Sequence, residues 1–111
     1  MTFSRVGNQF RAWRTTGPTH NFLGLCIEGP KPASPRVVRL AASEGRPPSG
    51  IDESKLVEAV LEGVERANRL CGTTCHVVEI TYVEDDSPRY SEYSILAEVI
   101  IRRVASGDPF V

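Results

Sequence analysis

The clearest pattern of hydrophobic and polar positions along the chain is a helical one that begins after Ile51. Asp52 precedes the pattern and is a suitable amino-terminal cap, while Gly72 follows it as a typical helix terminator. The pattern therefore predicts an amphipathic helix between Asp52 and Gly72. Its apolar positions, spaced by three and four residues, are Leu56, Val57, Val60, Leu61, Val64, Ala67 and Leu70.

A second helical pattern lies near the end of the chain. It begins within residues 87–94, where Ser87 followed by Pro88 is one candidate cap and Ser91 is another. Residues 106–111 are predicted to form a flexible tail after it. The predicted buried face consists of Ile95, Leu96, Val99, Ile100 and Val104.

Four other segments have the short apolar runs or the alternation that is typical of β-strands. Proline-rich loops at 30–35 and 44–50 separate some of them. The resulting order of strand, strand, strand, helix, strand, helix predicts an α/β (α+β) two-layer sandwich, with two helices on one face of a mostly antiparallel four-stranded sheet. The four segments are 6–16, which contains Phe10, Ala12 and Trp13, then 21–29, 36–43 and 77–83.

One residue of the first helix, Gly63, contradicts helix propensity, because a glycine there costs about 1 kcal/mol relative to alanine. Gly63 borders the apolar stripe, at spacings of three and four from Val60, Val64 and Ala67. Ala59 and Ala67 flank it at four-residue spacing. We therefore expect a strip of small residues that another helix or a strand approaches closely.

Length and composition indicate one domain. The 111 residues are 41% hydrophobic and carry a formal net charge of -1, which predicts a single domain over 1–111 with a core at about 6–105. Nucleic-acid binders held mainly by phosphate contacts are usually strongly basic, which this chain is not. Arg5, Arg11 and Arg14 nevertheless precede the first acidic residue, Glu28, so the amino-terminal quarter is locally basic.

The cysteines favour a reducing environment. Cys26, Cys71 and Cys75 are an odd number without a signal peptide, which predicts free thiols in a cytoplasmic protein. A candidate set of metal ligands consists of Cys71, Cys75 and His76, with Cys26 as a fourth. The three residues between Cys71 and Cys75 are more than the usual two of a metal-binding pair, which favours plain thiols. We expect no cofactor, no bound metal and no membrane span, since no run approaches about 18 apolar residues.

The segment AVLEGVERA, residues 59–67, resembles the helix signature Ala-Val-x-x-Gly-x-x-x-Ala of domain IV of translation elongation factor G and its eukaryotic counterpart, elongation factor 2. Residues 14–28 look like the segment of that family that runs from a Thr-Gly-Gly loop into an aromatic-containing strand. Residues 77–97 look like its following strand, acidic loop and final helix. The matched positions are Ala59, Val60, Gly63, Ala67, Thr16, Gly17, Asn21 and Phe22, with Ser94 near a loop serine of the family.

This resemblance, over about residues 14–105, implies the family's fold with its left-handed βαβ crossover. It also implies a non-enzymatic module that contacts ribosomal RNA of the small subunit through two tip loops. No Gly-x-x-x-x-Gly-Lys-Ser/Thr motif is present, so the chain carries no GTPase site. The loops depart from the family at Pro18, His20 and Tyr90. The candidate binding residues are Thr16, Gly17, His20, Asn21, Arg89, Tyr90 and Ser94.

Individual residues leave alternatives open. His20 is a general base, a nucleic-acid contact or simply exposed. The acidic run 84–86 binds a hard cation or is a solvated turn, and the latter is favoured because consecutive side chains point in alternate directions. Tyr90 and Tyr93, with Arg89, either stack on bases or cap the core. Two other functions therefore remain: a small-molecule enzyme that uses His20 and the acidic loop, and a structural domain that self-associates through the uncovered sheet face.

Overall fold

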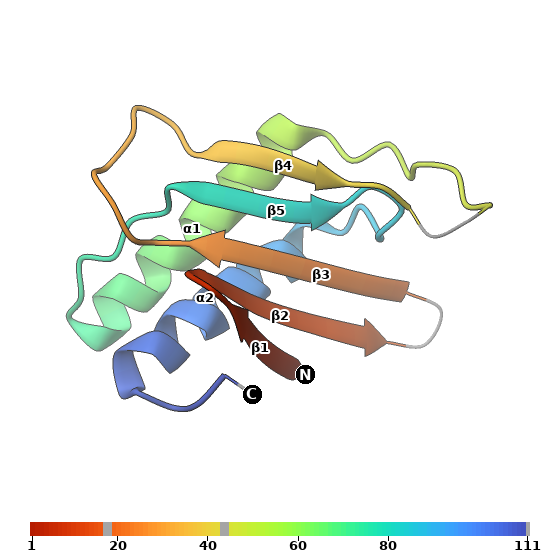
Figure 1. Cartoon of the computed structure of the whole chain (residues 1–111). Helices are drawn as coiled ribbons and strands as arrows, with labels where there is room; N and C mark the ends of the chain where they lie inside the picture. Colours follow the sequence, from red (N-terminus) through yellow and green to blue (C-terminus); the bar gives the residue numbers. More distant parts are fainter. Residues whose placement is uncertain (17–18, 43–44, 111) are drawn as a thin grey trace.

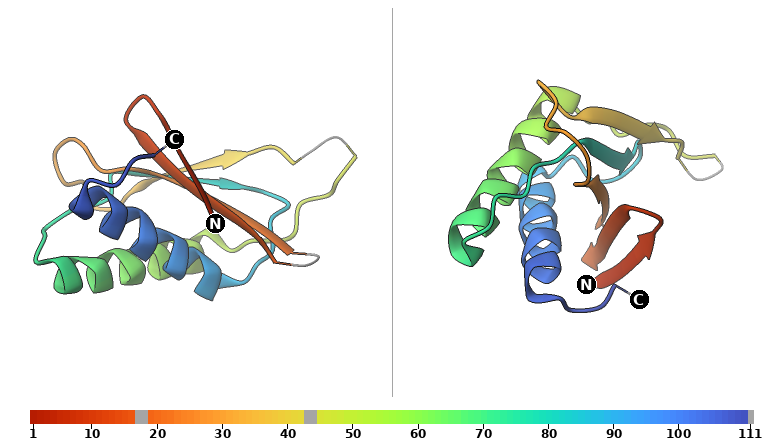
Figure 2. Two further views of the ribbon diagram at one scale, coloured as in Figure 1. Left: turned by 90° about the horizontal axis from the view of Figure 1, so that it is seen from below. Right: turned by 60° about the vertical axis from the view of Figure 1, so that its left-hand side comes forward.

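A computed structural model describes residues 1–16, 19–42 and 45–110, and it contains two helices and five strands in two layers (Figure 1). Both helices lie against the same face of the sheet (Figure 2). The predicted two-layer α/β class is confirmed. The elements are β1 (Thr2–Val6), β2 (Gln9–Thr16), β3 (Thr19–Cys26), β4 (Arg36–Leu40), α1 (Glu53–Cys71), β5 (Glu79–Val83) and α2 (Tyr90–Ser106).

The strands are ordered β1-β2-β3-β5-β4, and all neighbours are antiparallel except β4 and β5. In Figure 1, β4 and β5 point the same way, α1 lies behind them, and β5 lies below β4. A path from β4 through α1 to β5 therefore turns in the left-handed sense. Right-handed crossovers are the strong norm for parallel strands, so this connection is a distinctive feature of the topology.

The prediction of four strands was wrong by one, because β1 was missed. β1 pairs with β2 across the two-residue turn Gly7-Asn8, and Gly7 has a φ of 60°. A glycine at the first turn position is typical of type II′ hairpins. The strand TFSRV has no buried residue, only half-buried ones such as Phe3, so it has little of the hydrophobic signal on which strand prediction depends.

The first helix agrees with its predicted signals. The Asp52 side chain accepts hydrogen bonds from the backbone N–H groups of Ser54 and Lys55, and Gly72 ends the helix in the left-handed conformation. The second helix differs, because its cap position is Arg89 rather than Ser87 or Ser91, and no side chain caps it. Ser87 is unavailable as a cap because both its backbone polar groups are bonded to β3.

The core lies between the sheet and the two helices. Side chains from the inner face of the sheet and from the facing sides of α1 and α2 form one cluster. Phe110, in the segment expected to be a tail, packs against this cluster with its ring 4.9 Å from that of Phe10. Fully buried members include Leu23, Leu25, Leu56, Val60, Ile80, Leu96 and Ile100.

The strip of small residues on α1 is where α2 packs most closely. Ala59, Gly63 and Ala67 are all buried. A Cβ atom added at Gly63 would overlap the carbonyl oxygen of Ser94 and lie 3.2 Å from the Cβ of Ala97. The close approach expected from the sequence is thus a helix–helix contact, and the missing side chain is what permits it.

We expect Gly63→Ala to lower the free energy of unfolding by about 2 kcal/mol or more. The added methyl group meets a backbone carbonyl, so α2 must move as a body, and this outweighs the roughly 1 kcal/mol gained in helix propensity. Urea denaturation measures the change. The exposed Glu58→Ala on the same helix is the control and is expected to stay within about 0.5 kcal/mol of the wild type. Equal stability of Gly63→Ala and the wild type would contradict the helix contact.

Candidate functional site

Two segments far apart in the sequence are joined at one end of the sheet. The backbone N–H of Ser87 donates to the carbonyl oxygen of His20 at 3.1 Å, and the Asn21 side-chain amide donates to the carbonyl oxygen of Ser87 at 2.8 Å. The N–H of Phe22 donates to a carboxylate oxygen of Asp86 at 2.7 Å. The start of β3 and the loop after β5 therefore form one unit.

A third segment, from the connection between β4 and α1, completes this end of the molecule. The backbone N–H of Ser49 donates to the carbonyl oxygen of Glu84 at 2.9 Å, and its hydroxyl donates to the carbonyl oxygen of Asp86 at 2.5 Å. We call residues 19–22, 45–50 and 84–89 together the tip. Figure 1 shows these segments converging on the right-hand side of the view.

The three consecutive acids of the tip point to three different partners. Glu84 lies 3.6 Å from the Arg39 guanidinium and accepts from the Ala42 N–H at 3.1 Å. Asp85 lies 3.6 Å from Arg46, and Asp86 is buried against β3. No group of three His, Cys, Asp or Glu side chains within the described residues is arranged to hold a metal ion.

Asp86 is the most perturbed acid of the tip. Burial raises the pKa of its carboxyl group to about 6 from an ordinary value of 3.8, while the Phe22 N–H and the nearby His20 act in the opposite direction. Asp86 is therefore a structural acid, whose protonation is linked to the attachment of the loop to β3.

His20 and Arg89 are the exposed basic side chains of the tip that form no ion pair within the described residues. The Nδ1 atom of His20 lies 2.9 Å from the Thr15 hydroxyl, and its ring faces solvent. The exposed Arg89 side chain makes no hydrogen bond or ion pair with the described part of the chain. A hollow of about 340 Å³ adjoins His20 and is also lined by Arg46, Ser49, Asp85, Asp86 and Ser87.

The other predicted binding residues have different surroundings. Tyr90 is half-buried, and its hydroxyl accepts a hydrogen bond from the Asp52 N–H at 2.9 Å. Ser94 is buried on α2, where its hydroxyl accepts from Arg66 at 2.7 Å. Thr16 pairs with Thr19 at the end of β2, and Gly17 lies outside the described residues. Among the predicted residues whose side chains the structure describes, His20 and Arg89 are the ones exposed at the tip.

The tyrosine pair is divided between two roles. Tyr93 is fully buried, and burial raises the pKa of its hydroxyl. It therefore belongs to the core and does not stack on bases. Tyr90 remains at the surface between the amino-terminal ends of the two helices, with the Lys55 ammonium group 6.0 Å from its ring.

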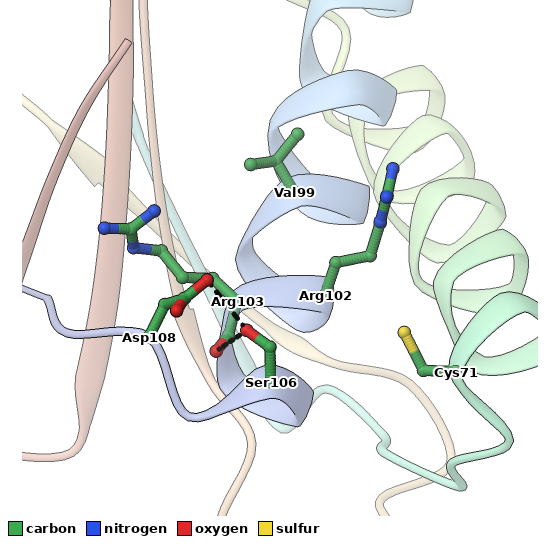
Figure 3. A pocket seen from close by; sticks show the side chains of 6 residues that line it. All are labelled: Cys71, Val99, Arg102, Arg103, Ser106 and Asp108. Atoms are coloured by element: carbon green, nitrogen blue, oxygen red, sulfur yellow. Dashed lines mark hydrogen bonds between the residues drawn. The ribbon is translucent and has the colours of Figure 1, made fainter.

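The cysteines do not converge. Cys26 is buried, and burial together with Glu79 and Glu28 raises the pKa of its thiol. Cys71 is exposed at the opposite end of the molecule from the tip, where it lines a shallow hollow with Val99 and Arg102 (Figure 3). His76, the third member of the predicted metal set, has its Nε2 atom 2.8 Å from the carbonyl oxygen of Gly29.

A second group of side chains, half-buried on the face of the sheet that the helices leave uncovered, was missed from the sequence. Phe10 and Ala12 of β2 point into the core, so the alternating neighbours of Ala12, Arg11 and Trp13, face away from the helices. Phe22 is the register partner of Trp13 on β3 and lies on the same uncovered face. The alternation along β2 was the signal that would have identified this group.

No protein-family model matches the sequence, and a search of the curated proteins finds no match. None of the helices in the described residues has the length and apolar character needed to cross a membrane.

The buried carboxyl group of Asp86 predicts a pH-dependent stability. Because its pKa is higher in the folded state than in the unfolded state, its contribution is fully present below about pH 4 and is lost as the pH rises through 6. As the pH rises from 4 to 7, the wild type should lose at most about 3 kcal/mol of unfolding free energy that Asp86→Asn does not lose. The stability of Asp86→Asn relative to the wild type should therefore increase over this range. Urea denaturation across this range measures it. Parallel pH profiles for Asp86→Asn and the wild type would refute the assignment.

Proposed function

We propose that this chain is a non-enzymatic RNA-binding module that contacts RNA of the small ribosomal subunit through its tip. The observation that carries the proposal is the charge arrangement of the tip. Its acids are matched by Arg39, by Arg46 and by burial, while His20 and Arg89 are left facing solvent. The tip therefore presents the charged Arg89 guanidinium and the His20 ring as donors to a phosphate backbone despite its acidic sequence.

Two further features support a role in RNA binding. The tip is held by hydrogen bonds among three segments, so the backbone that carries its exposed side chains is fixed in position before a ligand arrives, which lowers the entropic cost of binding. The motif resemblance to domain IV of elongation factor G, together with the left-handed crossover, favours the ribosome as the partner.

A small-molecule enzyme is the second candidate function, and the hollow beside His20 is the observation that favours it. Its walls carry a histidine, two carboxyl groups, an arginine and two serines, which are groups used in acid–base chemistry. The proposal of an RNA-binding module is preferred because both carboxyl groups are already engaged, Asp85 by Arg46 and Asp86 by the N–H of Phe22.

Co-sedimentation of the protein with small ribosomal subunits, across a series of salt concentrations, tests the proposed function. We expect binding that weakens steeply as salt increases, because phosphate contacts release counterions. The double variant His20→Ala/Arg89→Ala should bind more weakly, with a slope of log affinity against log salt reduced by about one to two units. Arg89 is chosen in place of Tyr90, whose hydroxyl supports the start of α1.

The matched control is Arg102→Ala, which removes an exposed arginine from the opposite end of the molecule (Figure 3). It should bind as the wild type does. Equal loss in Arg102→Ala and the double variant would mean that general charge, not the tip, controls binding. Absence of binding at low salt would refute the proposed function.

A further inference from the structure

The uncovered face of the sheet carries a row of aromatic and cationic side chains beside the tip. The rings of Trp13 and Phe22 stack with their centroids 6.1 Å apart and their planes inclined by 29°. The Arg11 guanidinium carbon lies 5.7 Å from the centroid of the Phe22 ring. We call Arg11, Trp13 and Phe22 the aromatic row.

The row continues directly into the tip. Two positions further along each strand, Thr15 and His20 form the next register pair on this face and contact each other through the His20 ring. A chain molecule that contacts His20 at the tip can therefore pass onto Trp13 and Phe22 without crossing a strand. Both helices lie on the opposite face of the sheet, so they leave this path uncovered (Figure 2).

Within the described part of the chain, the charge of Arg11 is not paired with an acid, in contrast to that of two arginines elsewhere in the fold. Arg14 on the helix-facing side of β2 is bound to Glu92 by both carboxylate oxygens, and Arg66 on α1 lies 3.0 Å from Glu98. The side chain of Arg11 instead donates to the neutral amide of Gln9, and it has no carboxylate partner within the described ranges. An unmatched positive charge remains beside two half-buried rings.

These side chains suit an extended strand of nucleotides. Nucleobases stack on aromatic rings whatever their sequence, while an arginine beside them attracts the phosphates. A duplex buries its bases and offers no such surface to flat rings on a sheet. A second copy of the same face is less favourable, because an isologous contact adds its own unmatched Arg11 and His20 to those already present.

We infer that the aromatic row binds single-stranded RNA, with bases stacked on Trp13 and Phe22 and a phosphate held by Arg11. This inference rests on the proposed function and deepens it. The tip supplies phosphate contacts, and the row adds contacts to unpaired bases, so that the RNA recognised here is a single strand or a loop.

Trp13 is the only tryptophan of the chain, so its fluorescence reports directly on the row. Titration with a decamer of uridylate is expected to quench this fluorescence, whereas a ten-base-pair RNA duplex should leave it unchanged. Arg11→Gln and Phe22→Ala both retain Trp13. Each should reduce the affinity for the decamer by a factor of up to about ten. Arg36→Gln, which makes the same charge change on β4 of the same sheet, is the matched control and should bind normally.

Circular dichroism establishes whether each variant is folded. If Phe22→Ala does not fold, the comparison of Arg11→Gln with the wild type still tests the inference. No quenching with millimolar decamer, equal quenching by the duplex, or undiminished binding in Arg11→Gln would each overturn the inference. A mass that increases with protein concentration and is lost in Arg11→Gln would assign the row to a second copy instead.

The two proposals fail in distinguishable ways. Binding to ribosomal subunits that depends on His20 and Arg89, without quenching of Trp13 by the decamer, would leave the tip as the only contact. Quenching by the decamer that depends on Arg11, without binding to ribosomal subunits, would assign the row to single-stranded RNA outside the ribosome.

Discussion

At Gly63 the two helices approach until the carbonyl group of Ser94 occupies the space where a side chain would otherwise be. This contact fixes the position of α2 against α1, and Arg66 reinforces it by binding the Ser94 hydroxyl. α2 in turn holds the sheet, because Glu92 in its first turn binds Arg14 of β2. The placement of the strands that carry the tip thus follows from the absence of one side chain on a helix.

The surface charge of the tip differs from the charge of its sequence. Three consecutive acids in a sequence suggest a negative patch on the surface. Here Asp86 is buried, and Glu84 and Asp85 are paired with arginines, so most of the negative charge is neutralised locally. The energetic cost appears in the raised pKa of Asp86. His20 and Arg89 are the exposed basic side chains at this end that form no ion pair in the part of the chain that the structure describes, so the surface differs from what the acidic sequence suggests.

A two-layer fold leaves one face of its sheet available, and the use of that face depends on which side chains alternate outward. In β2 the inward residues Phe10 and Ala12 belong to the core, whereas the outward positions carry Arg11 and Trp13. The hairpin with β3 then places Phe22 beside Trp13 and His20 beside Thr15. One continuous surface therefore runs from the tip across the uncovered face, and it joins the two proposed RNA contacts.

Local signals in the sequence were sufficient to predict α1 with its ends at Asp52 and Gly72, because caps and periodicity act within a few residues. They also predicted the fold class and the close approach at Gly63. They failed for β1, whose side chains are mostly exposed, and for the cap of α2, because β3 engages Ser87. Of the residues predicted for binding, His20, Asn21 and Arg89 lie at the tip, where Asn21 is buried and the other two are exposed. Burial of Asp86 and the stack of Trp13 on Phe22 were decided by the tertiary structure, since each needs a partner from a distant strand or loop.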